Sequence, residues 1–204
     1  MLKGIIGKTF ITFLIATLIG GCGHRLLAQV SSLNFKELTI KDGLSQGTVN
    51  DILQDHAGFM WFATDDGLNK YNGYEFTVFR QNHDDSTSIS DNFVKTVFED
   101  SRNRLWVGLG NNGLAHYDRK TGNFYNYSLP SPDSINEPDL VSVIKEDEAG
   151  NLWLGSSNGR LYCFNPDDSA FKLFRLQANG EAKSLPGHNF IYISDIEMDT
   201  VGNL

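Results

Sequence analysis

The chain has 204 residues, of which 40% are hydrophobic and 21% are charged. This apolar content excludes a disordered acidic tail, and the length is sufficient for one or two folded domains. Glycine contributes 20 residues and aromatic residues 12% of the chain, against 5 prolines, which excludes collagen and proline-rich low complexity. The composition favours many turns and many short strands packed through aromatic rings.

The formal charge of −8 is unevenly distributed along the chain. The first 28 residues contain three basic residues and no acid, which leaves 14 basic and 25 acidic residues, or −11, in the rest. Such a surface repels nucleic acid and anionic lipid, so no nucleic-acid partner is expected. Cys22 and Cys163 lie on either side of this boundary, which excludes an internal disulfide framework.

Residues 1–28 are typical of a signal peptide for export. Two lysines precede an apolar run over residues 10–19, which is too short to span a membrane, because a span requires about 20 residues. Two processing routes remain open, and an uncleaved anchor is a further alternative. The chain is cleaved after Ala28, or it is lipidated at Cys22, since residues 19–22 (IGGC) resemble a bacterial lipobox. Both routes place the chain that follows outside the cytoplasm.

A unit of about 46 residues is repeated along the rest of the chain. Three tryptophans are spaced by 45 and 47 residues, and each lies six residues after an aspartate. Apolar residues recur three and six residues before each aspartate, and a fourth set begins near the end of the sequence. The repeated positions are Trp61, Trp106 and Trp153, then Asp55, Asp100, Asp147 and Asp199, and, in the fourth set, Ile193 and Ile196.

Each unit contains four short β-type segments separated by turn signals. In the first unit these segments are 49–54, the residues around Trp61, 68–71 and 76–79. Asn-Gly pairs in the second and third units are typical of tight hairpins. Four antiparallel strands repeated at this interval predict an all-β fold, a β-propeller made of four-stranded antiparallel blades. No segment has helical periodicity over ten residues, which excludes a helical solenoid.

The repeat divides the chain into a signal peptide and about 3.5 blades. Because propellers use about 4 to 8 blades, these residues are expected to form one sector of a larger ring. Residues 35–38 correspond to a lone fourth strand, which is expected to close a blade that is absent from this sequence. The predicted boundaries are 1–28 for the signal peptide, 29–43 for the lead-in with the closing strand, 44–89, 90–137 and 138–187 for three blades, and 188–204 for the truncated start of a fourth.

The sequence also resembles the two-component regulator propeller repeat, over about residues 33–204. The resemblance is carried by residues 42–46 (DGLSQ), 49–61 and 67–73 (GLNKYNG). It implies the N-terminal sensor region of a hybrid histidine kinase with a seven-bladed ring, and a membrane-spanning kinase region outside this sequence. It further implies a periplasmic sensor, commonly of oligosaccharides released from polysaccharides, in a dimeric parent protein. The third unit departs from the family pattern by one extra residue within 159–164.

Several residues that could suggest chemistry are better explained by the repeat. Residues 108–113 spell G-x-G-x-x-G, but a strand rather than a helix follows, so they predict a hairpin and no dinucleotide site. One aspartate per blade favours turn roles over paired catalytic carboxylates, and one tryptophan per blade favours core packing over a sugar platform. The histidines lack partners at metal-binding spacings. No catalytic residue, metal site or cofactor is therefore predicted here.

A ligand is expected at the end of the blades where the connections are long and unequal. In a four-stranded meander, the turn between the second and third strands lies at the same end as the connection to the next blade. The connections at 81–92, 128–139 and 176–189 are polar and vary in sequence, as binding loops on rigid scaffolds do. The candidate ligand-binding residues, chosen by position, are Asp65, Asp66, His83, Asn111, Asn112, Asn158 and His188.

The repeat and the resemblance together favour the periplasmic sensor portion of a two-component signal transduction histidine kinase. Its expected partner is a polysaccharide-derived oligosaccharide or another periplasmic ligand, whose binding is signalled across the membrane. One alternative is a secreted or lipid-anchored propeller that acts as a binding scaffold, and a less favoured one is a propeller polysaccharide lyase or glycosidase. Whether the parent protein is an enzyme depends on the resemblance alone, because these residues contain no catalytic site.

Overall fold

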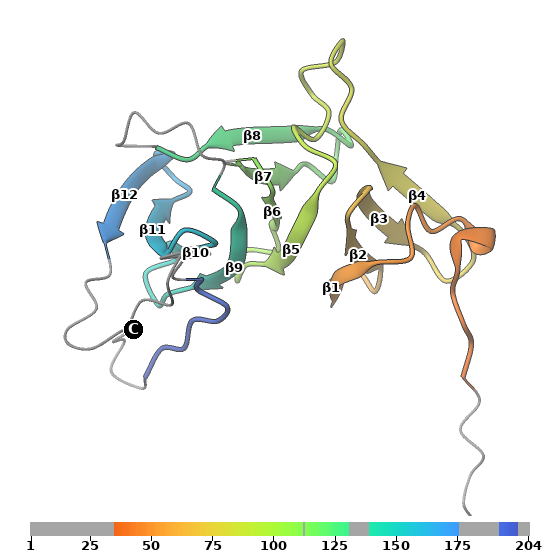
Figure 1. Ribbon diagram of the computed structural model, residues 1–204, viewed down its shortest axis with the longest axis horizontal. Helices are drawn as coiled ribbons and strands as arrows, with labels where there is room; N and C mark the ends of the chain where they lie inside the picture. Colours follow the sequence, from red (N-terminus) through yellow and green to blue (C-terminus); the bar gives the residue numbers. More distant parts are fainter. Residues whose placement is uncertain (1–34, 112, 131–138, 176–191, 200–204) are drawn as a thin grey trace, which may run out of the picture. The chain divides into compact units, whose positions relative to one another are not determined.

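The computed structural model describes residues 35–111, 113–130, 139–175 and 192–199 (Figure 1). The chain divides into two units, residues 1–37 and 38–204, and every strand given below belongs to the second unit. The expected signal peptide and its two processing sites lie outside the described residues. Among the described residues, no helix has the length and apolar content that crossing a membrane would require.

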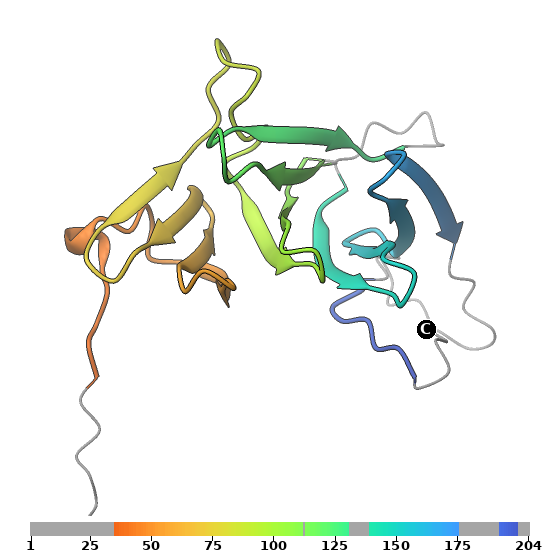
Figure 2. The same cartoon turned by 180° about the vertical axis from the view of Figure 1, so that it is seen from behind.

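The described residues form three four-stranded antiparallel sheets, in each of which neighbouring strands follow one another in the sequence (Figure 2). The predicted four-stranded blades are therefore confirmed. The 3-10 helix η1 (Ile40–Asp42) precedes the first blade. The blades contain, in order, β1 (Val49–Gln54), β2 (Met60–Thr64), β3 (Gly67–Tyr71) and β4 (Phe76–Phe79); β5 (Val94–Glu99), β6 (Leu105–Leu109), β7 (Gly113–Tyr117) and β8 (Phe124–Ser128); and β9 (Val141–Glu146), β10 (Leu152–Ser156), β11 (Arg160–Asn165) and β12 (Ala170–Arg175).

Successive blades meet through their first strands. Strand β1 contacts β5, and β5 contacts β9, while β5 also lies against β2 and β9 against β6. The first strands of the second and third blades, β5 and β9, therefore pack on the first two strands of the preceding blade. This arrangement is typical of propeller blades, which bury the apolar face of one sheet against the next.

Glycine on the second strand allows the next blade to approach closely. Gly108 and Gly155 occupy equivalent positions, two residues after Trp106 and Trp153. A Cβ atom added at Gly108 would lie 2.8 Å from the carbonyl oxygen of Val141, and one added at Gly155 would lie 2.9 Å from Cβ of Ile193. Both neighbours belong to the segment that starts the next unit, so these glycines set the spacing between blades.

Replacing Gly108 with valine is expected to lower the free energy of unfolding by about 1–3 kcal/mol, because the larger side chain overfills a packed interface. Urea denaturation measures this loss. Gly47→Ala is the control, since a Cβ at Gly47 meets nothing within 4 Å. Equal urea midpoints for Gly108→Val and the wild type would contradict the close packing of the second and third blades.

The second residue of each first strand is bulged. Pairing with the second strand skips one residue after Val49, after Val94 and after Val141. A bulge redirects the side chain of the unpaired residue. In the first blade, Asn50 Nδ2 donates to the carbonyl oxygen of Val94 at 2.9 Å, and in the third, Ser142 Oγ donates to the carbonyl oxygen of Ile193. The bulge thus ties two units to the chain that begins the next.

An aspartate and a tryptophan are hydrogen-bonded in the same way in every blade. The indole Nε1 donates to the aspartate Oδ2 at 2.7 Å for Trp61, 2.8 Å for Trp106 and 2.9 Å for Trp153. The other carboxylate oxygen accepts two backbone N–H groups of the following turn, such as those of Ala57 and Phe59 in the first blade. The aspartates therefore form turns as predicted, and they also orient the indoles.

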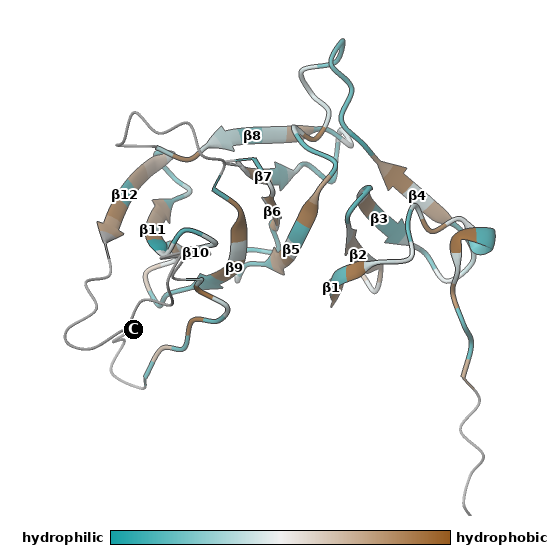
Figure 3. Cartoon of the chain, viewed as in Figure 1, coloured by the Kyte–Doolittle hydropathy of each residue, from teal (hydrophilic) through white to brown (hydrophobic). Residues whose placement is uncertain are grey.

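The tryptophans pack across the boundary between blades. Trp61 meets Tyr117 of the second blade with ring centroids 5.1 Å apart, and Trp106 meets Phe164 of the third at 5.6 Å. Figure 3 shows the hydrophobic residues concentrated along the strands of the three sheets. Trp61 and Trp106 are fully buried, whereas Trp153 is partly buried, because the described residues include no third strand of a following blade. The predicted packing role of the tryptophans is confirmed.

Two sequence expectations differ from the structure. Residues 35–38, expected to form a closing strand, are not in a strand, and Phe35 is 90% exposed. A strand requires a hydrogen-bonded neighbour, and the described residues contain no blade that could supply one. The fourth set also forms no strand, although Ile196 is buried and Ile193 N donates to the carbonyl oxygen of Ser156 at 3.1 Å.

The extra residue of the third unit does not disturb its strands. Strand β11 pairs with β10 in an uninterrupted register from Leu152 opposite Phe164 to Gly155 opposite Leu161. The extra residue lies in the turn, where Gly159 N donates to the carbonyl oxygen of Ser156 and Arg160 N to its hydroxyl. A turn absorbs an insertion easily because its backbone polar groups can bond locally.

Candidate ligand-binding face

One end of the three blades gathers the turns between second and third strands together with the long connections between blades. Gly67 N donates to the carbonyl oxygen of Asn92 at 2.6 Å, Gly110 N to that of Phe93 at 3.0 Å, and Ser157 N to that of Leu140 at 3.0 Å. We call this end the connection face. It is defined by the described residues of 64–67, 80–93, 109–113, 139–140 and 156–160.

The candidates Asp65 and Asp66 lie in one turn but have different roles. Asp65 Oδ1 accepts a hydrogen bond from Asn50 Nδ2 at 2.8 Å, so this carboxylate supports the bridge to the second blade. Asp66 accepts from Arg80 Nε at 3.2 Å and Nη2 at 3.0 Å. The Asp66 and Arg80 side chains are 42% and 46% exposed, so this pair contributes little to stability and is accessible to a ligand.

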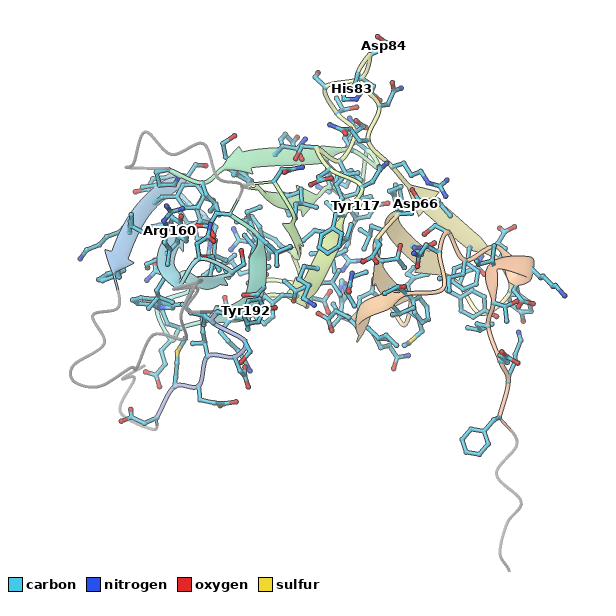
Figure 4. All side chains as sticks on the ribbon, viewed as in Figure 1. Asp66, His83, Asp84, Tyr117, Arg160 and Tyr192 are labelled. Atoms are coloured by element: carbon cyan, nitrogen blue, oxygen red, sulfur yellow. The ribbon has the colours of Figure 1, made fainter. Side chains whose placement is uncertain are left out.

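The other candidates are dispersed over the connection face. Asn111 Nδ2 donates to Asp91 Oδ2 at 2.8 Å, and Asn158 lies half-buried in the turn between β10 and β11. Figure 4 shows His83 at the tip of the loop between β4 and β5, apart from Asp66. Asn112 and His188 lie outside the described residues. The structure thus brings Asp65 and Asp66 together but does not bring His83 to them.

The loop between β4 and β5 lies along the outer edge of the second blade. Phe124 N donates to the carbonyl oxygen of Thr87 at 2.8 Å, and the Asn126 amide bonds the backbone of Ser88 and Ser90. Ile89 is fully buried beneath this segment. These bonds anchor the loop to β8, the edge strand of the second blade. The loop thereby partly covers the exposed edge of this sheet.

A small cavity of about 220 Å³ lies between β4, this loop and the start of β8. The polar residues that line it include Arg80, Asn82, Asp85 and Thr87. Hydrogen bonds from the Thr87 hydroxyl and backbone N–H lower the pKa of Asp85, which keeps this carboxylate ionised at neutral pH. The residues that line the cavity thus include one basic and one acidic residue.

Sequence reasoning missed a buried polar cluster on the third blade. Asp139 is 1% exposed, and its Oδ2 accepts hydrogen bonds from Arg160 Nη1 at 3.0 Å and from the Tyr162 hydroxyl at 2.7 Å. Burial and the neighbouring carboxylate raise the pKa of Tyr162, so the phenol remains protonated and donates. Arg160 and Tyr162 are two residues apart on one strand, so their side chains lie on the same face of the sheet. This two-residue spacing was the signal in the sequence that could have predicted the cluster.

The geometry of the described residues offers no assembled metal site. No group of three or more His, Cys, Asp or Glu side chains within the described ranges is placed to hold a metal ion. The polar groups of the connection face are instead paired carboxylates, amides and guanidinium groups. Such groups can hydrogen-bond a hydroxyl-rich molecule.

The repeat that builds this face matches a known family. The family model described as "Two component regulator propeller" matches residues 43–66 and 88–111, which contain the first two strands of the first two blades and the residues that lead into them. In these two segments the chain is similar to the two-component regulator propeller family. A curated relative, histidine kinase P4 of Formosa agariphila, is 54% identical over 65 residues. That match covers 32% of this chain and 5% of the relative, so the chain spans a small part of its length.

Solved structures of two-component extracellular domains are similar to this chain in fold. Two crystal structures of the extracellular domain of BT4673 from B. thetaiotaomicron each superpose with a TM-score of 0.53 at 24% identity. That protein is named as a one component system in one structure and as a hybrid two component system in the other. Each match covers 61% of this chain and 16% of the solved chain, which supports the propeller fold.

Proposed function

We propose that this chain is the exported sensor portion of a two-component histidine kinase, in which ligand binding on the periplasmic side is signalled across the membrane. The observation that carries the proposal is the 54% identity to part of a histidine kinase, together with the family's propeller repeats. A sensor can act through an equilibrium between two states, which a ligand shifts only if it binds one state better.

The proposed ligand is an oligosaccharide that binds at the connection face. Asp66 and Arg80 form an exposed ion pair there, and Arg80 also lines the adjacent polar cavity. Carboxylates and guanidinium groups can accept hydrogen bonds from sugar hydroxyls and donate to them, respectively. A cavity of about 220 Å³ is below the usual range for drug-sized ligands, so it would hold one part of a larger saccharide.

Isothermal titration calorimetry of the complete propeller region against a panel of oligosaccharides tests this proposal. Heat of binding is expected for at least one saccharide, and Asp66→Ala is expected to weaken that binding about tenfold, since a hydrogen bond to a charged group contributes about 1.5–3 kcal/mol. Arg102→Gln is the matched control, because Arg102 also forms an exposed ion pair, with Asp167. This pair lies in the turns between β5 and β6 and between β11 and β12, which are not part of the connection face.

Two results would contradict different parts of the proposal, the identity of the ligand and the position of its site. Absence of heat with every saccharide would remove the oligosaccharide as the ligand. Equal weakening by Asp66→Ala and Arg102→Gln would place binding away from the connection face. Autophosphorylation of the complete protein, measured with and without a saccharide that binds, is expected to change if the propeller is the sensor.

A further inference from the structure

In each blade, one residue of the third strand pairs directly with the repeated tryptophan of the second strand. These pairs are Lys70 with Trp61, His116 with Trp106 and Cys163 with Trp153. Side chains of directly paired residues lie on the same face of a sheet, so each of the three lies beside an indole. Of these side chains, an imidazole is the one whose charge ordinarily changes near neutral pH.

His116 lies between two aromatic rings at the boundary of the second and third blades. Its ring centroid is 5.0 Å from that of Trp106 and 5.9 Å from that of Tyr125, and it is inclined by 15° to the Tyr125 ring. Tyr125 pairs with His116 on β8, so the three rings form a row across β6, β7 and β8. Since Trp106 packs against Phe164 of the third blade at 5.6 Å, the imidazole is part of the packing that joins these blades.

A permanent cation lies against the same indole. The Cζ atom of Arg104 is 5.4 Å from the Trp106 ring centroid, and its Nε lies 2.6 Å from Asp100 Oδ2. The Nη2 atom of Arg104 is buried and has no hydrogen-bond partner among the described residues. A protonated His116 would therefore add a second cation beside an indole that already has one, and like charges in a partly buried site repel each other.

The first blade fills the two equivalent positions differently. Lys70 stands in place of His116, and Phe59 in place of Arg104, four residues after the repeated aspartate. The Nζ atom of Lys70 is 3.8 Å from the Phe59 ring centroid, which is a favourable position for a cation. Each of the two blades thus has one lysine or arginine at these positions, and only the second adds a group that ordinarily titrates near neutral pH.

Charged groups of the second blade act on His116 in opposite directions. Burial is the largest cause that lowers the pKa of His116, and the charges of Arg104 and Arg119 add to this shift. The carboxylates of Asp100 and Asp118 oppose the shift without cancelling it. The folded state therefore favours the neutral imidazole.

The third blade adds further ionisable groups to this boundary. Asp167 lies 4.0 Å from Arg104, and Glu146 accepts a hydrogen bond from the backbone N–H of Ser101 at 2.7 Å. A hydrogen bond from Arg102 lowers the pKa of Asp167. Tyr162 belongs to the same core cluster as Trp106, and burial raises the pKa of its phenol. Among all these groups, histidine is the residue type whose ordinary pKa lies between pH 5 and pH 8.

We propose that His116 makes the packing between the second and third blades sensitive to pH. The neutral imidazole stacks between Trp106 and Tyr125, whereas protonation places a second cation beside Arg104 and weakens the contact between the blades. His116 is only partly buried and Tyr125 is 55% exposed, so this row of rings reaches solvent and can exchange protons with it.

The sign of the pH dependence follows from the favoured neutral form. The stabilisation from His116 is complete above the ordinary histidine pKa of about 6.5, and it is lost as the pH falls through the lower folded value. The first boundary is expected to lack this dependence, because lysine ordinarily titrates near pH 10.4.

Hydrogen–deuterium exchange in the complete protein tests the proposal at the boundary itself, since it reports local opening. The wild type, His116→Gln and His116→Phe are compared at about pH 7.5 and about pH 5.5, on either side of the ordinary histidine pKa. The ratio of wild-type to variant protection in β6, β7 and β11 is expected to fall at the lower pH. His116→Phe keeps a ring in the row without a titratable group, so it serves if His116→Gln does not fold. His83→Gln, at an exposed loop tip, is the control and is expected to match the wild type.

Four results would overturn the proposal. Equal ratios at both pH values would show that protonation of His116 does not affect the packing. A ratio that rises at the lower pH would show that the protonated ring binds its aromatic neighbours better than the neutral ring does. An equal fall in β2 and β3, which contain no histidine, would place the pH-sensitive group elsewhere. Loss of the effect in His83→Gln would assign it to the loop between β4 and β5.

Discussion

Trp106→Ala is expected to lower the free energy of unfolding by about 3–5 kcal/mol. The Trp106 side chain is almost completely buried, it packs against Phe164 of the next blade, and its indole N–H bonds Asp100. The substitution therefore opens a cavity at the boundary between two blades and removes a donor from a buried carboxylate. Urea denaturation, followed by far-ultraviolet circular dichroism, measures the loss.

Two further variants separate the causes of this loss. Tyr74→Ala removes an aromatic ring that is 92% exposed, and it is expected to change stability by less than about 0.5 kcal/mol. Trp106→Phe keeps an aromatic ring but loses the indole donor, so it is expected to cost less than the alanine variant. An unchanged urea midpoint for Trp106→Ala would contradict the packing of Trp106 between blades.

Arg119→Gln is expected to lower the free energy of unfolding by about 2–3 kcal/mol. The substitution leaves the buried Asp55 carboxylate without its cation, and a buried charge that loses its partner is strongly destabilising. The magnitude is set below that of a fully buried pair, because the Arg119 side chain is 25% exposed whereas that of Asp55 is 0% exposed. Arg80→Gln is the matched control. Its exposed pair with Asp66 is expected to contribute less than about 1 kcal/mol.

The same ion pair predicts how stability depends on pH. Burial alone would raise the pKa of Asp55, but hydrogen bonds from Trp61 and Arg119 outweigh it, so the pKa in the folded state is lowered. The stabilisation from this carboxylate is therefore complete above its unfolded pKa of about 3.9 and is lost as the pH falls through the lower folded value. Arg119→Gln is expected to reduce this acid-dependent loss as the pH falls below about 4. Equal pH profiles for the variant and the wild type would contradict the pairing.

The strands could be predicted from the sequence because local signals and the repeat agreed. Turn residues separated the four segments of each unit, and the recurrence of Trp61, Trp106 and Trp153 at one register distinguished core packing from coincidence. The bond from each indole to its aspartate was not predicted. The bond forms because a hairpin brings the residue after the first strand beside the second strand. The six-residue spacing in the sequence does not by itself reveal this contact.

The candidate site was only partly predictable, since its pairs join residues far apart in the sequence. Asp65 was chosen as a surface residue, yet it bonds Asn50 at the boundary between two blades. Asp139 accepts a hydrogen bond from Tyr162, which is 23 residues away in the sequence. Both side chains are buried, and composition does not reveal this burial. Residues 35–38 were expected to form a strand because their pattern matched, but a strand also needs a neighbour.

A crystal structure of the complete propeller region tests most directly the claim that these repeats are consecutive blades of one ring. It is expected to show β1, β5 and β9 as neighbouring inner strands around a single axis, with Ile193–Asp199 as the inner strand of the next blade. Each tryptophan N–H is expected to lie within hydrogen-bonding distance of the aspartate six residues before it. Three sheets packed in any other order, or tryptophans without this shared partner, would contradict the account.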